Sequence, residues 1–179
     1  MYHILKQIIK TGIKTEAPPP ADESMRLTAQ RLQQDILNVL GGALNIRFVD
    51  AGSCNGCEQE IHALNNAYYN IEGLGIKFVA SPRHADMLLV TGPVSRHMEV
   101  ALKRTYDATP EPKLVVAIGA CACDGGILSP NGGGESYATC GKISNVIPVD
   151  VAVPGCPPTP TAILQGILTA IAGPHETQK

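Results

Sequence analysis

The pattern of apolar and polar residues changes near residue 46. From there on, short unbroken apolar runs alternate with segments of mixed polarity. Unbroken runs are typical of strands that are buried on both faces, as in a parallel sheet. Five runs predict such strands: "IRFV" (46–49), "IKFVA" (76–80), "MLLVT" (87–91), "LVVAIG" (114–119) and "VDVAV" (149–153).

Helical patterns fall between most of these runs. They cover about 57–69 and 95–108, and a third follows the last strand at 159–172. Strands that alternate with helices predict a doubly wound α/β domain. One connection does not fit this scheme, because only "SPRHAD" (81–86) separates the second run from the third. A parallel crossover normally takes about a dozen residues or more.

The first 42 residues have a different character. Ile4, Leu5, Ile8 and Ile9 alternate with lysines in an amphipathic helical pattern, and a proline-rich stretch follows at 17–22. A second helix is expected from near Ser24, a good N-cap, to the glycines at 41–42. We therefore expect an N-terminal arm (1–42), an α/β domain (43–173) and a short tail (174–179). The basic amphipathic face suits a membrane surface or a membrane-embedded partner, and the stiff linker favours the partner.

Composition narrows the functional classes. The net charge is −2, Trp is absent and only two Phe are present, so neither a basic field nor a stacking platform points to nucleic acid. The N-terminal sequence lacks the pattern of a secretory leader, and no apolar run approaches the ~20 residues that span a bilayer. We expect a cytoplasmic protein that is peripheral to a membrane, with no transmembrane segment.

Six cysteines then need an explanation. Three disulfides are disfavoured in a reducing compartment, and buried free thiols fit only one or two of the positions. Cys54 and Cys57 follow the first predicted strand, Cys121 the fourth and Cys156 the fifth. Because the carboxyl ends of parallel strands meet at one edge, where such folds bind ligands, these four thiols are expected to converge.

Four thiolates suit either zinc or an iron–sulfur cluster. Structural zinc usually takes two local cysteine pairs, whereas Cys121 and Cys156 arrive singly from distant loops. Spacing therefore favours a cluster over zinc, without excluding zinc.

Cys123 and Cys140 are expected to be surplus thiols with packing roles, the latter on a short helix away from the edge. Glu58 and Glu60 are expected near the first turn of a helix, where negative charge is favourable. Proton handling is their less favoured reading.

Four motifs carry a resemblance to a known family: "GSCNGCEQEI", "ASPRHADMLLVTGPV", "PEPKLVVAIGACACDGG" and "IPVDVAVPGCPPTPTAIL". Over residues 46–172 the chain resembles the small, electron-transfer subunit of membrane-bound energy-converting [NiFe] hydrogenases, a group that includes formate hydrogenlyase. That family is homologous to the cluster subunit of respiratory complex I. The resemblance implies a flavodoxin-like fold.

The resemblance also implies one proximal [4Fe–4S] cluster, held by Cys54, Cys57, Cys121 and Cys156. The implied function is electron relay between a NiFe centre on a partner large subunit and a ferredoxin-like iron–sulfur subunit, with further membrane-embedded partners. No residue of this chain would be catalytic, because the NiFe site belongs to the large subunit.

Two departures refine this interpretation. The complex I relatives carry adjacent cysteines in the first motif, whereas two residues separate Cys54 from Cys57, which favours a hydrogenase partner. Soluble uptake hydrogenases have longer small subunits with cysteines for two more clusters. This sequence has no such second set, so one cluster is expected. Three alternatives stay open: a complex I-like quinone or ferredoxin oxidoreductase, a zinc-stabilised binding module, and a redox sensor that uses Cys121 and Cys123.

Overall fold

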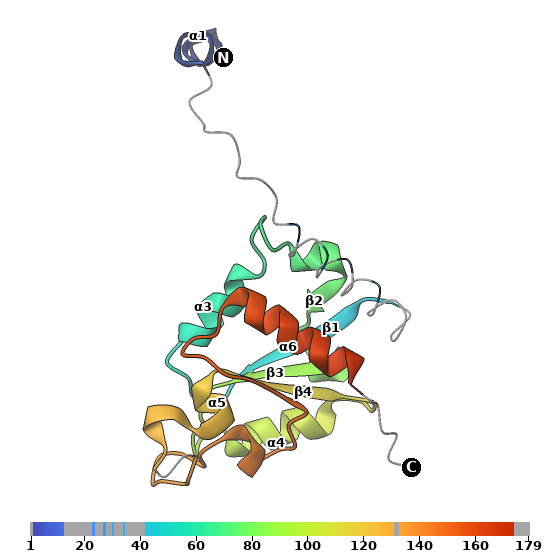
Figure 1. Ribbon diagram of the computed structural model, residues 1–179, viewed down its shortest axis with the longest axis vertical. Helices are drawn as coiled ribbons and strands as arrows, with labels where there is room; N and C mark the ends of the chain where they lie inside the picture. Colours follow the sequence, from blue (N-terminus) through green and yellow to red (C-terminus); the bar gives the residue numbers. More distant parts are fainter. Residues whose placement is uncertain are drawn as a thin grey trace.

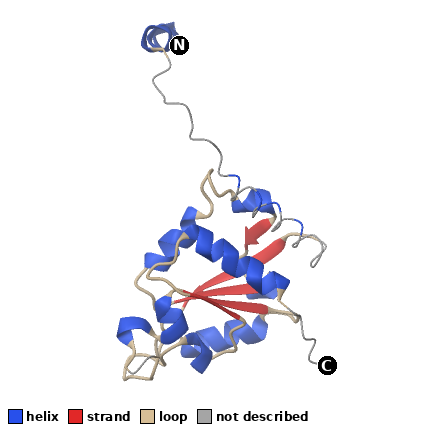
Figure 2. Ribbon diagram, viewed as in Figure 1, coloured by secondary structure: helices blue, strands red, loops and turns tan. Residues whose placement is uncertain are grey.

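The structure is a computed structural model, which describes residues 2–12, 42–130 and 133–173 together with positions 23, 27, 30 and 34. Five strands form one sheet in the order β2-β1-β3-β4-β5, and every neighbouring pair is parallel. Helices cover both faces of the sheet (Figures 1 and 2). The strands are β1 (Leu44–Asp50), β2 (Ile76–Phe78), β3 (Met87–Thr91), β4 (Leu114–Ile118) and β5 (Val151–Val153). The α-helices are α1 (Tyr2–Thr11), α3 (Gly56–Ala63), α4 (Glu99–Ala108), α5 (Ala120–Asp124) and α6 (Pro160–Ala172).

The strand order confirms the predicted fold class. Order 2-1-3-4-5 with parallel strands is that of flavodoxin-like doubly wound sheets. From β1 the chain adds β2 on one side of the sheet and then β3, β4 and β5 on the other, so the strand order reverses between β1 and β3. Open α/β sheets bind ligands at the carboxyl ends of the strands near such a point.

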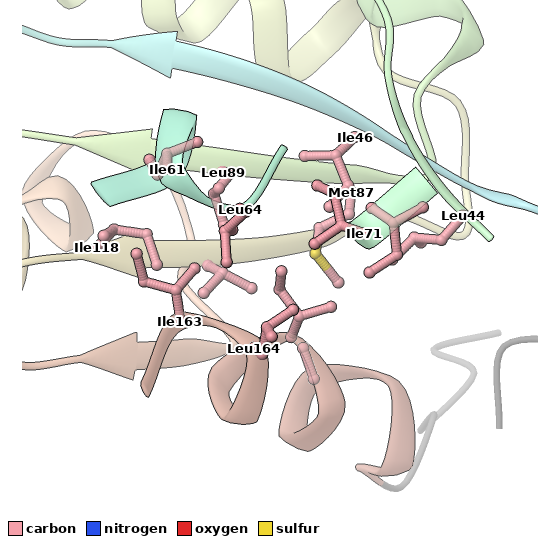
Figure 3. Packing of buried hydrophobic residues seen from close by; sticks show 14 of the residues in the cluster. Leu44, Ile46, Ile61, Leu64, Ile71, Met87, Leu89, Ile118, Ile163 and Leu164 are labelled. Carbon is pink, nitrogen blue, oxygen red and sulfur yellow. The ribbon is translucent and has the colours of Figure 1, made fainter. Parts of the chain in front are cut away.

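Two apolar cores lie on opposite faces of the sheet, because successive side chains of a strand point to opposite sides. In β3, Met87 and Leu89 belong to one core, and Leu88 and Val90 to the other. The first core packs α3 and α6 on the sheet, as the side chains of Ile61, Leu89 and Ile163 illustrate (Figure 3). The second core packs α4 and α5 on the opposite face, through residues that include Leu102 and Ala122.

Strand register explains the short connection between β2 and β3. Ile46 of β1 lies opposite Phe78, the last residue of β2, and also opposite Met87, the first residue of β3. The chain therefore crosses only the width of β1, about 10 Å, and need not return along the sheet. Asp86 anchors the crossing, since its carboxylate accepts a hydrogen bond from the backbone N–H of Asn45 at 2.9 Å.

Two helices are shorter than predicted. The helix expected over 57–69 ends at Ala63, because Asn66 Oδ1 accepts hydrogen bonds from the N–H groups of Tyr68 and Tyr69 and closes a turn. The helix expected from 95 begins at Glu99, because Ser95 forms a β-bridge with Thr139 and a turn follows over 96–98.

The N-terminal helix α1 is as amphipathic as its sequence predicts. Every residue from 2 to 12 is exposed, including Ile4, Leu5, Ile8 and Ile9. The proline-rich stretch and most of the helix expected from Ser24 lie outside the described residues, so the division at residue 42 stays a prediction.

Candidate functional site

Three loops meet at the carboxyl edge of the sheet. They follow β1, β4 and β5, as expected from the sequence: Cys54 and Cys156 lie in the loops themselves, and Cys57 and Cys121 lie at the starts of α3 and α5. Backbone hydrogen bonds join the last two loops: Gly119 N–H donates to Val153 O at 2.8 Å, and Ala120 N–H donates to Gly155 O at 2.7 Å. The loop positions are thus fixed by the sheet and by one another.

The four predicted cysteines line a single cavity of about 160 Å³. The other lining residues are small or apolar, apart from one serine: Ser53, Gly56, Gly92, Ala120, Gly155 and Pro157. Cys54 and Cys156 are exposed, whereas Cys57 and Cys121 are half-buried. The cavity is therefore open to solvent at Cys54 and Cys156, and its other side is lined by residues that follow the ends of the strands.

A tight turn presents the first cysteine pair. Asp50, the last residue of β1, accepts hydrogen bonds from the backbone N–H groups of Gly52 and Ser53 at 2.8 and 2.9 Å. Asn55 then adopts a left-handed conformation (φ 70°), and α3 begins at Gly56. This geometry places Cys54 in the loop and Cys57 in the first turn of the helix.

Glycine makes room for the sulfur atoms at two points. A Cβ on Gly119 would lie 2.5 Å from Cys57 Sγ, and a Cβ on Gly126 would lie 2.6 Å from Cys121 Sγ. Both glycines have positive φ, +91° and +54°, a conformation that other residues rarely adopt. The backbone therefore approaches each sulfur more closely than a side chain would allow.

The electrostatics of the cavity favour the binding of a positively charged metal group. Burial, followed by the nearby Glu58 carboxylate and the other three thiols, raises the pKa of Cys57 to about 12. The pKa of Cys121 is raised by burial and then by Cys156 and Cys54. Thiolates gathered in one cavity repel one another, and a metal group removes this repulsion because it binds the deprotonated form.

The donor set fits an iron–sulfur cluster. Four thiolates are the soft ligands that zinc and iron–sulfur clusters take. The cavity volume of about 160 Å³ is many times the roughly 15 Å³ that one water-sized group needs. In the described part of the chain, no three Cys, His, Asp or Glu side chains are grouped closely enough for a single metal ion.

The remaining two cysteines lie elsewhere. Cys123 is half-buried beside the second core, with its sulfur 3.8 Å from Ala117 O. Cys140 is buried, and its thiol donates to Glu99 at 3.4 Å. The predicted short helix at Cys140 is wrong: the residue directly follows a β-bridge residue, Thr139, and its N–H is bonded to Val94 O at 2.7 Å.

Sequence reasoning missed the surroundings of Glu58. This residue does lie in the first turn of α3, but its side chain is only 5% exposed and contacts Ser53 and Thr91. Thr91 ends a strand that carries no cysteine, so the sequence alone gave no signal for this contact. Glu60 is half-buried on the same helix.

Comparisons with known proteins agree with the motifs. The profile of the family described as NADH ubiquinone oxidoreductase, 20 Kd subunit, matches residues 54–170. A probable membrane-bound hydrogenase subunit (mbhJ) of Pyrococcus furiosus is 43% identical over 84% of this chain and 87% of that protein. Formate hydrogenlyase subunit 7 of Escherichia coli K12 is 40% identical over 86% of this chain, which spans 57% of that relative.

A solved structure is also similar. A chain of the membrane-bound sulfane sulfur reductase, an archaeal respiratory membrane complex, matches with a TM-score of 0.61 at 31% identity, over 82% of this chain and 73% of that one. Among the described residues, no helix combines the length and the apolar character needed to cross a bilayer. These similarities confirm the resemblance that the motifs predicted.

Proposed function

Because the chain belongs to the family of the 20 kDa subunit of NADH–ubiquinone oxidoreductase, we propose that it is the electron-transfer subunit of a membrane-associated [NiFe] hydrogenase complex. The coarser part of this statement, a subunit of a membrane-bound oxidoreductase complex, rests on the family and on relatives at 40–43% identity. The hydrogenase partner is supported by those relatives and by the two residues that separate Cys54 from Cys57.

The observation that carries the proposal is the convergence of Cys54, Cys57, Cys121 and Cys156 on one cavity. We assign these four thiolates as the ligands of one [4Fe–4S] cluster. When bound, such a cluster accepts and releases single electrons, at a potential set by its surroundings.

The chain's own residues position that group and control access of water. The sheet edge and the small or apolar residues of the cavity wall cover it on one side. Gly119 and Gly126 admit the backbone close to sulfur, where peptide dipoles tune a cluster. Cys54 and Cys156 are on the exposed side, so a partner chain is needed to exclude solvent there.

The partners follow from this arrangement. We assign the NiFe centre to a large subunit, the next electron carrier to a ferredoxin-like subunit, and the location to the cytoplasmic side of the membrane. The exposed apolar face of α1 is proposed to clamp a membrane-embedded subunit, because Ile4, Ile8 and Ile9 have no cover within the described residues.

A second candidate function has its own support. The family description names an NADH–ubiquinone oxidoreductase, and the similar solved structure is a sulfane sulfur reductase complex. The same cluster would then serve a quinone, ferredoxin or sulfur-reducing enzyme without nickel.

Metal analysis of the intact purified complex, with its subunits identified by mass spectrometry, separates these candidates. The hydrogenase proposal predicts nickel in the complex and a brown colour with an EPR signal on reduction. Iron without nickel would favour the second candidate. A colourless complex with zinc bound to this subunit would overturn the cluster assignment and leave a zinc-stabilised module.

The redox-sensor alternative is disfavoured by chemistry. Sensor cysteines are exposed and have lowered pKa values. Burial raises the pKa of Cys123 to about 11, with the Asp124 carboxylate adding to the shift, and burial also raises that of Cys121.

A further inference from the structure

Glu58 places a carboxylate in the interior directly after the second cysteine of the C-x-x-C motif. Its side chain is 5% exposed. A buried carboxylate is costly unless hydrogen bonds compensate for the lost water, so its contacts identify what holds it in place. A favourable charge at a helix N-terminus would require no such burial.

One oxygen of this carboxylate receives two hydroxyl groups. Ser53 Oγ donates to Glu58 Oε1 at 2.5 Å, and Thr91 Oγ1 donates to the same oxygen. The other oxygen, Oε2, has no partner among the described residues. The two hydroxyls therefore supply all the hydrogen bonds that the structure gives to this side chain.

These contacts join both ends of the cysteine loop to the centre of the sheet. Ser53 directly precedes Cys54 and Glu58 directly follows Cys57, so their hydrogen bond spans the pair. Thr91 is the last residue of β3, which lies between β1 and β4. Ser53 Oγ also accepts from the N–H of Asn55 at 3.2 Å, which directs its own proton toward Glu58.

The end of β3 fits closely against the same loop. A Cβ on Gly92 would lie 2.5 Å from the backbone nitrogen of Ser53, so only glycine allows this approach. The backbone contact and the Thr91 hydrogen bond fix the position of the loop relative to the end of β3. That position in turn determines where Cys54 and Cys57 lie relative to Cys121 and Cys156.

We propose that Glu58 is a positioning residue, whose carboxylate holds Ser53 and Thr91 and thereby fixes the spacing of Cys54 and Cys57 for the bound group. This inference rests on the proposed function, because it treats both cysteines as ligands. It requires the hydrogen-bond geometry of Glu58 rather than its charge alone.

The test compares Glu58→Ala with Glu58→Gln in the intact complex. An amide oxygen still accepts from both hydroxyls, whereas alanine accepts from neither. We expect Glu58→Ala to lose iron to a chelator about tenfold faster or more, given the strength of hydrogen bonds to charged groups. Its EPR spectrum should also shift or broaden. Glu58→Gln should stay within about threefold of the wild-type rate and keep the wild-type spectrum.

Thr91→Val and Glu60→Ala serve as matched variants. Valine keeps the shape of threonine and removes the hydroxyl that the end of β3 donates to Glu58, so Thr91→Val should speed iron loss several-fold. This variant keeps the inference testable if Glu58→Ala fails to fold. Glu60→Ala removes a half-buried carboxylate from the same helix and should leave the rate unchanged.

Two outcomes would overturn the inference. Glu58→Ala and Thr91→Val could retain iron and the spectrum of the wild type, or Glu58→Gln could be as damaged as Glu58→Ala, which would assign the effect to charge. A wild-type complex without an iron–sulfur signal would instead overturn the proposed function.

Discussion

Cys57 and Cys140 are both shielded thiols, yet their surroundings give them different chemistry. Cys57 lines a cavity with three other cysteines, where a bound metal group would hold it as thiolate. Cys140 is 3% exposed and donates to the carboxylate of Glu99. Burial, and then this hydrogen bond to Glu99, raise the pKa of Cys140 above its ordinary value. Cys140 is therefore a packing residue that stays protonated at neutral pH.

This environment predicts the pH dependence of Cys140 alkylation. In the folded protein, iodoacetamide should modify Cys140 slowly at pH 8 and with a midpoint above the ordinary value of about 8.5, since only the thiolate reacts. Because the folded pKa is the higher one, the neutral thiol stabilises the fold below that ordinary value, and this contribution declines at higher pH. Mass spectrometry of the modified peptide gives the profile.

Glu99→Gln is the control for this profile. It removes the acceptor charge, so the midpoint should move down while Cys140 stays slower than in the unfolded chain. Alkylation at pH 8 as fast in the folded as in the unfolded protein would contradict the packing role.

At the scale of elements, the apolar runs predicted all five strands, because parallel strands buried on both faces need continuous apolar sequence. The carboxyl-edge rule then predicted where the four cysteines meet. Helix ends were predicted less well, since they depend on local hydrogen bonds such as those of Asn66 and Ser95. The contact of Glu58 with Thr91 depends on the spatial neighbourhood of β1 and β3, which no local pattern encodes.

The turn after β4 gives a prediction at this scale. Gly119→Ala introduces a methyl group 2.5 Å from Cys57 Sγ and should displace that sulfur, lowering the iron content of the purified subunit by half or more. It also forces alanine into a backbone region that is essentially restricted to glycine (φ 91°, ψ 158°), at a cost of about 1–3 kcal/mol.

Gly75→Ala separates these two effects. Gly75 also has a positive φ, +86° with ψ 19°, and nothing lies within 4 Å of its Cβ position, so alanine there adds left-handed backbone strain without a sulfur contact. Its iron content should match that of the wild type. Equal iron loss in both variants would mean that strain alone explains the result.

For the whole molecule, the arrangement of the sheet separates a protected face of the site from an open one. Residues that follow the strands, such as Ser53, Gly92 and Gly155, line the cavity from within, while Cys54 and Cys156 are exposed at its mouth. Among the described residues, α1 is a second surface without a packing partner, since all its residues are exposed. Figure 1 shows this helix outside the layers formed by the sheet and its covering helices. Both surfaces are those of a subunit that works in a complex.

The two possible roles of α1 differ in their response to charge. Replacing both Ile8 and Ile9 by Glu should release the subunit from a purified complex, because the apolar face is lost. Replacing both Lys6 and Lys10 by Glu should leave a protein clamp assembled, but would release a helix that lies on an anionic membrane surface. Co-purification of the subunit with its complex is the readout. Full assembly of the Ile variant would exclude both roles.

The assignment of four cysteine ligands is tested most directly by iron and sulfide content in six single Cys→Ala variants of the full chain. With one [4Fe–4S] cluster bound, the wild type should contain about four irons per chain. Alanine at position 54, 57, 121 or 156 should remove or degrade the cluster, whereas alanine at 123 or 140 should keep the iron content and the EPR signal. Retention of all four irons after loss of Cys57, or their loss with Cys140, would contradict it.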